Sequence, residues 1–284
     1  MKKNCLIGLL VFVAVMIGTH IAEAKSGKRV IFSVVPVHAP EKIWQLYYPV
    51  VEYLNKNTPI NWEFRLYTSH EALEEGVCKG DVHIILTGPF LAYRVYKGCG
   101  AKPILLALND EGKVSMKILL ITMDPEIKAL KDLKGKKVGL FKPITAAYIV
   151  TKAMLEKEGL NEQNTQFIVF QGLDRLIEAM MAGTVSAIGL RDNVLVLLKG
   201  HNYREIKVSE PIPGFVFMAS TNAPETVKTI FIRSMLKLKP LSNKGHELLM
   251  QGWDETIKYG FIKPTGDYLQ LLERNNMMYG RHIK

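Results

Sequence analysis

The residues from Lys142 to Ala147 are the part of this sequence whose types and spacing best fit a binding chemistry. A short apolar run at 138–141 precedes them, and helical periodicity restarts at Thr145. The order turn, buried strand, loop and helix places the first unpaired N–H groups of a helix at the carboxyl end of a strand. These N–H groups and the positive end of the helix dipole bind anions. The segment therefore predicts an anion-binding loop.

No arrangement of residues typical of catalysis accompanies this loop. The sequence contains no nucleophile elbow, no His-x-x-x-His metal pair and no Gly-x-x-x-x-Gly-Lys-Ser/Thr phosphate loop. The seven histidines are dispersed, and Glu71, Glu74 and Glu75 share one face of an expected helix. We therefore expect no enzyme, no metal site and no cofactor.

The first 24 residues have the organisation of a secretory signal peptide. Lys2 and Lys3 form a basic start, Leu6 to Ile17 is almost wholly apolar, and Ala22-Glu23-Ala24 is a small-x-small cleavage signal. The apolar run is shorter than the roughly 20 residues that a membrane-spanning helix needs, so a retained anchor is the less favoured alternative. We expect cleavage after Ala24 and a periplasmic protein.

Length and charge limit the possible partners. The chain has 284 residues and a formal net charge of +10, which becomes +9 when Lys2, Lys3 and Glu23 leave with the signal peptide. The remaining length, about 260 residues, suffices for one large or two modest α/β domains. The basic residues are scattered and the protein is expected to be exported. We therefore expect a small anionic ligand and no nucleic acid.

Two cysteines remain after processing, Cys78 and Cys99. An even pair in an oxidising compartment is a candidate disulfide, and each of the two lies near the end of an expected helix. The sequence does not show whether their Cα atoms lie within bonding distance. A disulfide and two free thiols therefore both remain open.

Expected strands and helices alternate along the chain. Apolar periodicity predicts helices at 43–54, 70–79, 89–96, 145–158, 173–182, 224–238, 244–259 and 267–274. Short apolar runs predict strands at 30–35, 62–67, 82–86, 104–108, 116–122, 138–141, 167–170, 185–190 and 216–220. This alternation is typical of parallel sheets with helices on both faces. The sequence therefore predicts an α/β protein.

Several of these segments together resemble one known family, the phosphate/phosphite/phosphonate substrate-binding proteins of ABC importers. This family belongs to the type II periplasmic binding proteins. The segments that carry the resemblance are 48–54, 71–84, 87–93, 132–136 (Asp-Leu-Lys-Gly-Lys), 172–187 and 259–268. They follow one another in the family's order over nearly the whole mature chain.

The resemblance implies a two-lobe architecture. Each lobe would contain a mainly parallel sheet flanked by helices, and two strands would cross between the lobes as a hinge. Residues 25–115 together with 215–284 would form the first lobe, and residues 116–214 the second. The ligand would lie in the cleft and hinge closure would enclose it. The protein, a monomer, would then deliver its ligand to an ABC permease in the membrane.

The same resemblance assigns ligand contacts to loops at the ends of strands. The residues that it assigns are His70, Thr87, Lys142, Thr145, Ala146 and Ala147. His70 falls near a family tyrosine, and Thr87 belongs to the family's glycine-proline loop. His38, in the loop after the first expected strand, is a further candidate, although it equally fits a residue at the entry of a helix.

The anion loop departs from the family's pattern, which reads aspartate-proline-x and then serine-threonine-serine. Here it keeps one hydroxyl, on Thr145, and the backbone donors of Ala146 and Ala147. Each hydroxyl bond to an anion that is lost without replacement costs roughly 1.5–3 kcal/mol. Lys142 either compensates with its charge or is simply solvated.

Arg191 marks a second departure, at the end of an expected strand. Phosphonate-binding members of the family place acidic groups there, where they meet an amino group of the ligand. An arginine favours a more acidic ligand through bidentate pairing with carboxylate or phosphate, unless it pairs with Asp192 or caps a surface turn. Family aspartates also fall at His83 and Ser186.

The sequence thus predicts an exported solute-binding protein that captures a small phosphate- or phosphonate-like anion for an ABC importer. The alternative is a ligand-sensing or partner-binding periplasmic domain of the same fold with a non-phosphonate ligand.

Overall fold

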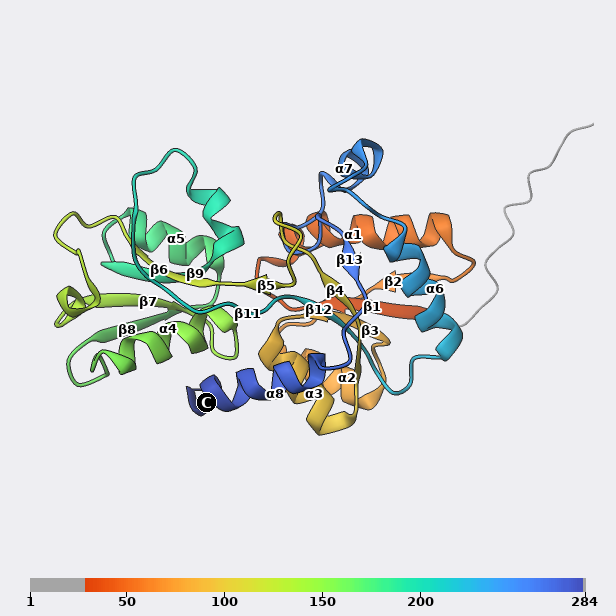
Figure 1. Ribbon diagram of the computed structural model, residues 1–284, viewed down its shortest axis with the longest axis horizontal. Coiled ribbons are helices and arrows are strands. Elements are labelled where there is room, and N and C mark those ends of the chain that lie inside the picture. The colour runs from red at the N-terminus through yellow and green to blue at the C-terminus, as the bar shows by residue number, and fades with distance from the viewer. Residues whose placement is uncertain (1–28, 283–284) are drawn as a thin grey trace, which may run out of the picture.

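A computed structural model describes residues 29–282. The predicted signal peptide and its cleavage site lie outside the described residues. The molecule has two lobes, each built on its own sheet (Figure 1). Helices flank both sheets, which confirms the predicted α/β class. Over residues 29–282, none of the helices has both the length and the apolar character needed to cross a bilayer.

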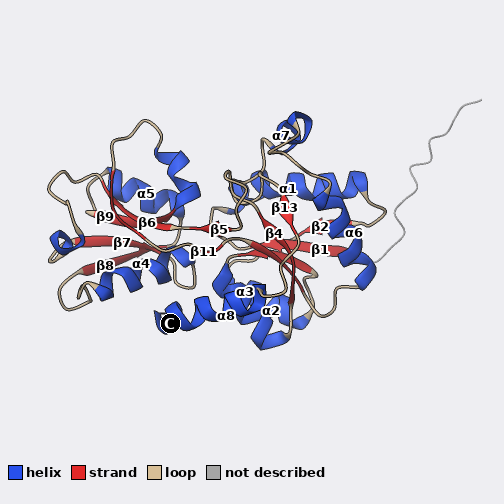
Figure 2. Ribbon diagram, viewed as in Figure 1, coloured by secondary structure: helices blue, strands red, loops and turns tan. Residues whose placement is uncertain are grey.

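Lobe 1 is the body around a six-stranded sheet with the order β13-β4-β12-β3-β1-β2. Its strands are β1 (Val30–Val34), β2 (Trp62–Phe64), β3 (Ile84–Thr87), β4 (Lys102–Ala107), β12 (Val216–Ala219) and β13 (Phe261–Ile262). Its helices are α1 (Pro40–Asn57), α2 (His70–Lys79), α3 (Pro89–Cys99), α6 (Glu225–Leu236), α7 (Lys244–Met250) and α8 (Tyr268–Tyr279). Helices α1 and α6 cover one face of the sheet, and α2, α3 and α8 cover the other (Figure 2).

Lobe 2 is the body around a five-stranded sheet with the order β10-β6-β9-β7-β8. Its strands are β6 (Ile118–Thr122), β7 (Lys137–Phe141), β8 (Gln166–Phe170), β9 (Ala187–Arg191) and β10 (Arg204–Val208). Helices α4 (Ala146–Lys157) and α5 (Leu173–Met181) pack against it. A side chain at Gly189 of β9 would overlap the hydroxyl of Thr151 on α4. The glycine therefore allows helix and strand to approach closely.

Two short strands lie between the lobes (Figure 1), namely β5 (Ser115–Met116) and β11 (Ile212–Pro213). They pair antiparallel, with Met116 opposite Ile212. The amide of Gly214 also donates to the carbonyl of Val114, at 2.8 Å. The chain thus passes between the lobes twice, at two adjacent points.

The sheets are mixed, so the expectation of mainly parallel sheets is wrong. In lobe 1, β1 is parallel to β2 and β3, but β12 is antiparallel to β3 and β4. In lobe 2, β7 is parallel to β8 and β9, but β6 is antiparallel to β9. The antiparallel strands β6 and β12 follow the two crossings and start at the cleft. The strands of the βαβ units instead end there.

Some elements differ from the sequence prediction. The prediction of a single helix over 244–259 is wrong, because α7 ends at Met250. Asp254 then accepts hydrogen bonds from the amide and hydroxyl of Thr256. Strand β10 was not predicted because most of its side chains are exposed and show no apolar alternation. Strands β11 and β13 have only two residues each.

A disulfide joins Cys78 to Cys99, with their Cα atoms 5.2 Å apart. The two residues lie at the C-terminal ends of α2 and α3, which pack against each other. The disulfide therefore connects the two helices at their C-terminal ends and not at their N-termini.

Candidate functional site

A small cavity of about 40 Å³ lies between the two lobes. Lobe 1 contributes residues that follow β1 and β3, and lobe 2 contributes residues at the ends of β7 and β9. Phe215, which connects β11 to β12, completes the wall. The carboxyl ends of strands from both lobes therefore meet at one cavity, the usual place of a ligand in open α/β sheets.

Three helices begin at this cavity. Helix α2 starts with His70, α3 follows Gly88, and α4 follows Thr145, and all three residues line the space. Ala146 and Ala147, which also line it, belong to the first turn of α4, and their amides have no acceptor within residues 29–282. Converging N-termini present N–H groups and partial positive charge, which together favour an anion.

The hydroxyl of Thr145 is used within the protein. Its oxygen accepts a hydrogen bond from the amide of Tyr148, at 3.3 Å, and donates one to the carbonyl of Lys142, at 2.7 Å. Thr145 is therefore the N-cap of α4. In this structure its proton is not available to a ligand, and the donors that remain in the loop are backbone amides.

The residue before this cap, Ile144, has an unusual backbone. Its φ is +64°, and no other non-glycine residue in the described part of the chain has a positive φ. A β-branched residue in this region is a genuine outlier, and such strain costs about 1–3 kcal/mol. The side chain is 5% exposed and lines the cavity. Sequence reasoning missed Ile144, because an isoleucine gives no signal for a left-handed turn.

Arg191 supplies the cation of the site. It ends β9, lines the cavity, and lies with its guanidinium 4.7 Å from the centre of the Phe215 ring. Its Nη1 atom is buried and has no hydrogen-bond partner among the described residues. Burial lowers the pKa of Arg191, whereas the negative charge of Asp254 opposes that shift. A buried N–H without a partner is costly, so this atom is suited to meet an acceptor on a ligand.

Arg191 does not pair with Asp192, which was the alternative role expected for it. The Asp192 carboxylate accepts hydrogen bonds from the amides of Lys117, at 2.8 Å, and Asn193, at 2.9 Å. Within the described chain no carboxylate lies within 4.0 Å of the Arg191 guanidinium.

His70 and Thr87 also line the cavity, and both are buried. Burial, together with the positive charge of Lys142, lowers the pKa of His70 to about 4. The imidazole is therefore neutral at pH 7, where it offers one donor and one acceptor. Thr87 is fully buried at the end of β3.

Two of the eight assigned residues, Lys142 and His38, are not part of the lining. The ammonium group of Lys142, a half-buried residue, donates a hydrogen bond to the carbonyl of Pro36, at 2.6 Å. His38 is half-buried in the loop after β1, and its Nδ1 atom lacks a partner within residues 29–282. Burial lowers the pKa of His38.

The sequence matches the family described as the periplasmic substrate-binding proteins of phosphonate ABC transporters, over residues 32–267. The chain belongs to this family. Its members are substrate-binding components of transporters and not enzymes, and they act in the periplasm.

The phosphate-import protein PhnD of Mycolicibacterium smegmatis is a curated relative. It is 29% identical over 145 residues, which cover 49% of this chain and 45% of that protein. The match thus spans less than half the length of that relative.

Solved structures show the same type II fold. The binding protein of a phosphonate ABC transporter from Pseudomonas aeruginosa has a TM-score of 0.77 and 14% identity, covering 89% of this chain and 87% of its own. The PhnD1 protein of Prochlorococcus marinus, solved with methylphosphonate, has a TM-score of 0.75 and 13% identity, covering 89% of this chain and 99% of its own.

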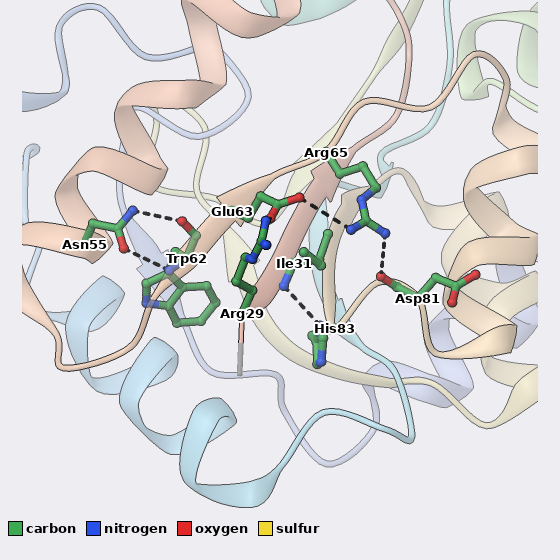
Figure 3. Close-up of polar contacts among 8 residues, drawn as sticks. All are labelled: Arg29, Ile31, Asn55, Trp62, Glu63, Arg65, Asp81 and His83. Carbon is green, nitrogen blue, oxygen red and sulfur yellow. Dashed lines mark hydrogen bonds and ion pairs between the residues drawn. The ribbon is translucent and has the colours of Figure 1, made fainter. Parts of the chain in front are cut away.

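His83, at the position of a family aspartate, lies away from the cavity. It immediately precedes β3, whereas the cavity residue Thr87 ends that strand. Its Nδ1 accepts a hydrogen bond from the amide of Ile31, at 3.0 Å (Figure 3). Nearby, Arg65 bonds Glu63 and the carbonyl of Asp81 (Figure 3). The substitution therefore belongs to the sheet of lobe 1 and not to the site.

A larger groove of about 780 Å³ lies between α4 and β10 of lobe 2 and the C-terminal end of α8, which belongs to lobe 1. It is open and lined by basic and acidic residues together. Some of its basic residues have carboxylate partners: Lys152 pairs with Glu162, and His282 lies 3.2 Å from a carboxylate oxygen of Glu156.

Proposed function

We propose that this protein is an exported solute-binding protein that captures a small phosphate- or phosphonate-like oxyanion between its lobes and delivers it to an ABC permease. One observation carries the proposal, namely the convergence of three helix N-termini and the Arg191 guanidinium on one cavity. Dipole ends, free amides and a fixed cation all complement the negative oxygens of such a ligand.

Each assigned residue then has a distinct role. The anion accepts hydrogen bonds from the amides of Ala146 and Ala147 and gives Arg191 Nη1 the partner that it lacks. Thr87 and His70 complete the polar wall on the side of lobe 1. Lys142 acts indirectly, through its bond to the other lobe.

The proposal includes hinge closure. It takes residues 25–115 with 215–284 as one body and residues 116–214 as the other, connected by β5 and β11. A ligand that contacts both bodies binds the closed form better than the open form, so it shifts the population towards closure. The protein acts as a monomer that presents the closed form to the permease.

The test is thermal unfolding of the protein beginning at Lys25, refolded from denaturant to remove bound ligand. Phosphate, phosphite, methylphosphonate, sulfate and taurine are added in turn. An anion present at 100 times its dissociation constant stabilises the fold by about 2.7 kcal/mol, a shift of several degrees. We expect a shift for the phosphorus oxyanions, its loss in Arg191→Met, and its retention in Arg233→Met, which changes an exposed arginine on α6.

A melting temperature that no anion changes would contradict anion capture. The alternative, a sensing or partner-binding domain with a non-phosphonate ligand, would then be preferred. A shift that Arg191→Met leaves intact would place the anion outside the interlobe cavity.

A further inference from the structure

We infer that Ile144 sets the size limit of the binding site. The site then takes a tetrahedral oxyanion whose fourth substituent is no larger than a methyl group, and it excludes longer and aminated phosphonates. The inference rests on the proposed function, because it concerns the same cavity.

The first argument is the space between the lobes. The cavity measures about 40 Å³, and a cavity needs roughly 10–15 Å³ to hold one water molecule. It is thus larger than that minimum but far below the roughly 300–1,000 Å³ of sites for drug-sized ligands, so its size favours a small ligand. A propyl chain would need more space than this cavity provides.

The second argument is the place of Ile144 in the lining. Its side chain is 5% exposed and borders the cavity immediately before the amides of α4. A left-handed backbone favours glycine or asparagine over isoleucine, yet isoleucine stands here with a φ of +64°. The strained conformation keeps a branched side chain at the one loop that also holds the anion.

The third argument is the chemistry of the remaining wall. Apolar side chains make up most of it, and the larger ones are Val35, Val37, Phe90, Leu91, Phe141, Ile144 and Phe215. No aspartate or glutamate belongs to the described lining, so an ammonium group would find no countercharge there and would lose its hydration. A hydrogen or methyl substituent instead meets an apolar surface, whereas a fourth oxygen would need another donor.

The test compares a series of anions on three proteins by titration calorimetry: phosphite, methylphosphonate, ethylphosphonate, propylphosphonate and 2-aminoethylphosphonate. The proteins are the wild type, Ile144→Gly and Ile144→Val. Glycine empties the space and accepts the positive φ, whereas valine removes a single methyl group and keeps the strain. Thermal unfolding of each protein without ligand checks that it folds.

We expect the wild type to bind methylphosphonate at least 10-fold more tightly than propylphosphonate. Ile144→Gly should reduce that ratio by at least 10-fold, and Ile144→Val by about 2-fold. In Ile144→Gly, 2-aminoethylphosphonate should bind no more tightly than ethylphosphonate. Equal wild-type affinities for methyl- and propylphosphonate would overturn the inference about Ile144 but not the proposed function. The same holds if Ile144→Gly leaves the ratio of these two affinities unchanged. Failure of every anion to bind the wild type would overturn the proposed function and this inference with it.

Discussion

The ammonium group of Lys142 donates a 2.6 Å hydrogen bond to the carbonyl oxygen of Pro36. Lys142 follows β7 in lobe 2, and Pro36 follows β1 in lobe 1, so the bond connects the two lobes beside the cavity. It can form only when the lobes are close together. If the lobes close around a ligand as proposed, we expect this bond of Lys142 to stabilise the closed form directly.

We predict that Lys142→Met weakens methylphosphonate binding by roughly 5- to 30-fold. The substitution keeps the apolar stem but removes a charged donor whose bond contributes about 1–2 kcal/mol to the closed form. Titration calorimetry measures the affinity, and small-angle scattering should show a larger radius of gyration for the unliganded variant. Lys136→Met, in an exposed turn of the same lobe, is the matched control. An affinity for Lys142→Met within twofold of the wild type would rule out this role.

Thr145 is predicted to stabilise α4 and not to contact the ligand through its hydroxyl. Thr145→Val removes the cap that accepts from Tyr148, so the free energy of unfolding should fall by about 1 kcal/mol, whereas Thr145→Ser should preserve it. Urea unfolding gives the free energies, and methylphosphonate titration gives the affinities. Full stability of Thr145→Val together with lost binding would show instead that the hydroxyl holds the anion.

His70 makes stability depend on pH in a defined range. Burial lowers its pKa to about 4 from the ordinary value of 6.5, so between these values the folded protein binds fewer protons than the unfolded chain. The contribution of the neutral imidazole is fully present above pH 6.5 and is lost as the pH falls towards 4. From pH 7.5 to 5.0 it should fall by about 2 kcal/mol.

Urea unfolding of the wild type and of His70→Gln at both pH values isolates this effect. The difference between their free energies of unfolding should change by that amount between the two pH values. His201→Gln, at an exposed position, should follow the wild type. A difference that does not depend on pH would mean that His70 keeps an ordinary pKa in the folded protein.

The disulfide between Cys78 and Cys99 should affect stability without affecting binding. It closes a loop with a sequence separation of 21, and removing a bond of that span typically costs about 3 kcal/mol. The cysteines end α2 and α3, whereas the N-termini of these helices line the cavity. The double variant Cys78→Ala, Cys99→Ala should therefore unfold at lower urea concentration but bind methylphosphonate within twofold of the wild type. Unchanged stability, or loss of binding in the folded variant, would contradict this separation.

The apolar periodicity of the sequence predicted most of the secondary structure, because the buried face of a helix or strand repeats at a regular spacing. The expected helix at 70–79 agrees with α2, and the expected strand at 138–141 agrees with β7 to within one residue. The helix expected over 244–259 failed because Asp254 forms a local turn with Thr256, which competes with the helix. The mixed direction of the sheets depends on the two crossings, which apolar periodicity does not show.

Part of the candidate site was predicted from the sequence, mainly because the resemblance to the family assigns contacts to strand ends and helix starts. Six assigned residues line the cavity, among them Arg191 and Ala147. The apolar wall was missed, because residues such as Phe215 look like ordinary core. The bond from Lys142 to Pro36 was missed for another reason, since it joins residues that meet only through tertiary structure.

The central claim is that a small oxyanion binds in the interlobe cavity, and a crystal structure of the refolded protein with methylphosphonate tests it most directly. We predict that the phosphonate oxygens lie within hydrogen-bonding distance of the amides of Ala146 and Ala147 and of Arg191 Nη1, with the methyl group facing Ile144. Methylphosphonate found only in the groove between α4, β10 and α8, or in neither place at saturating concentration, would contradict the account.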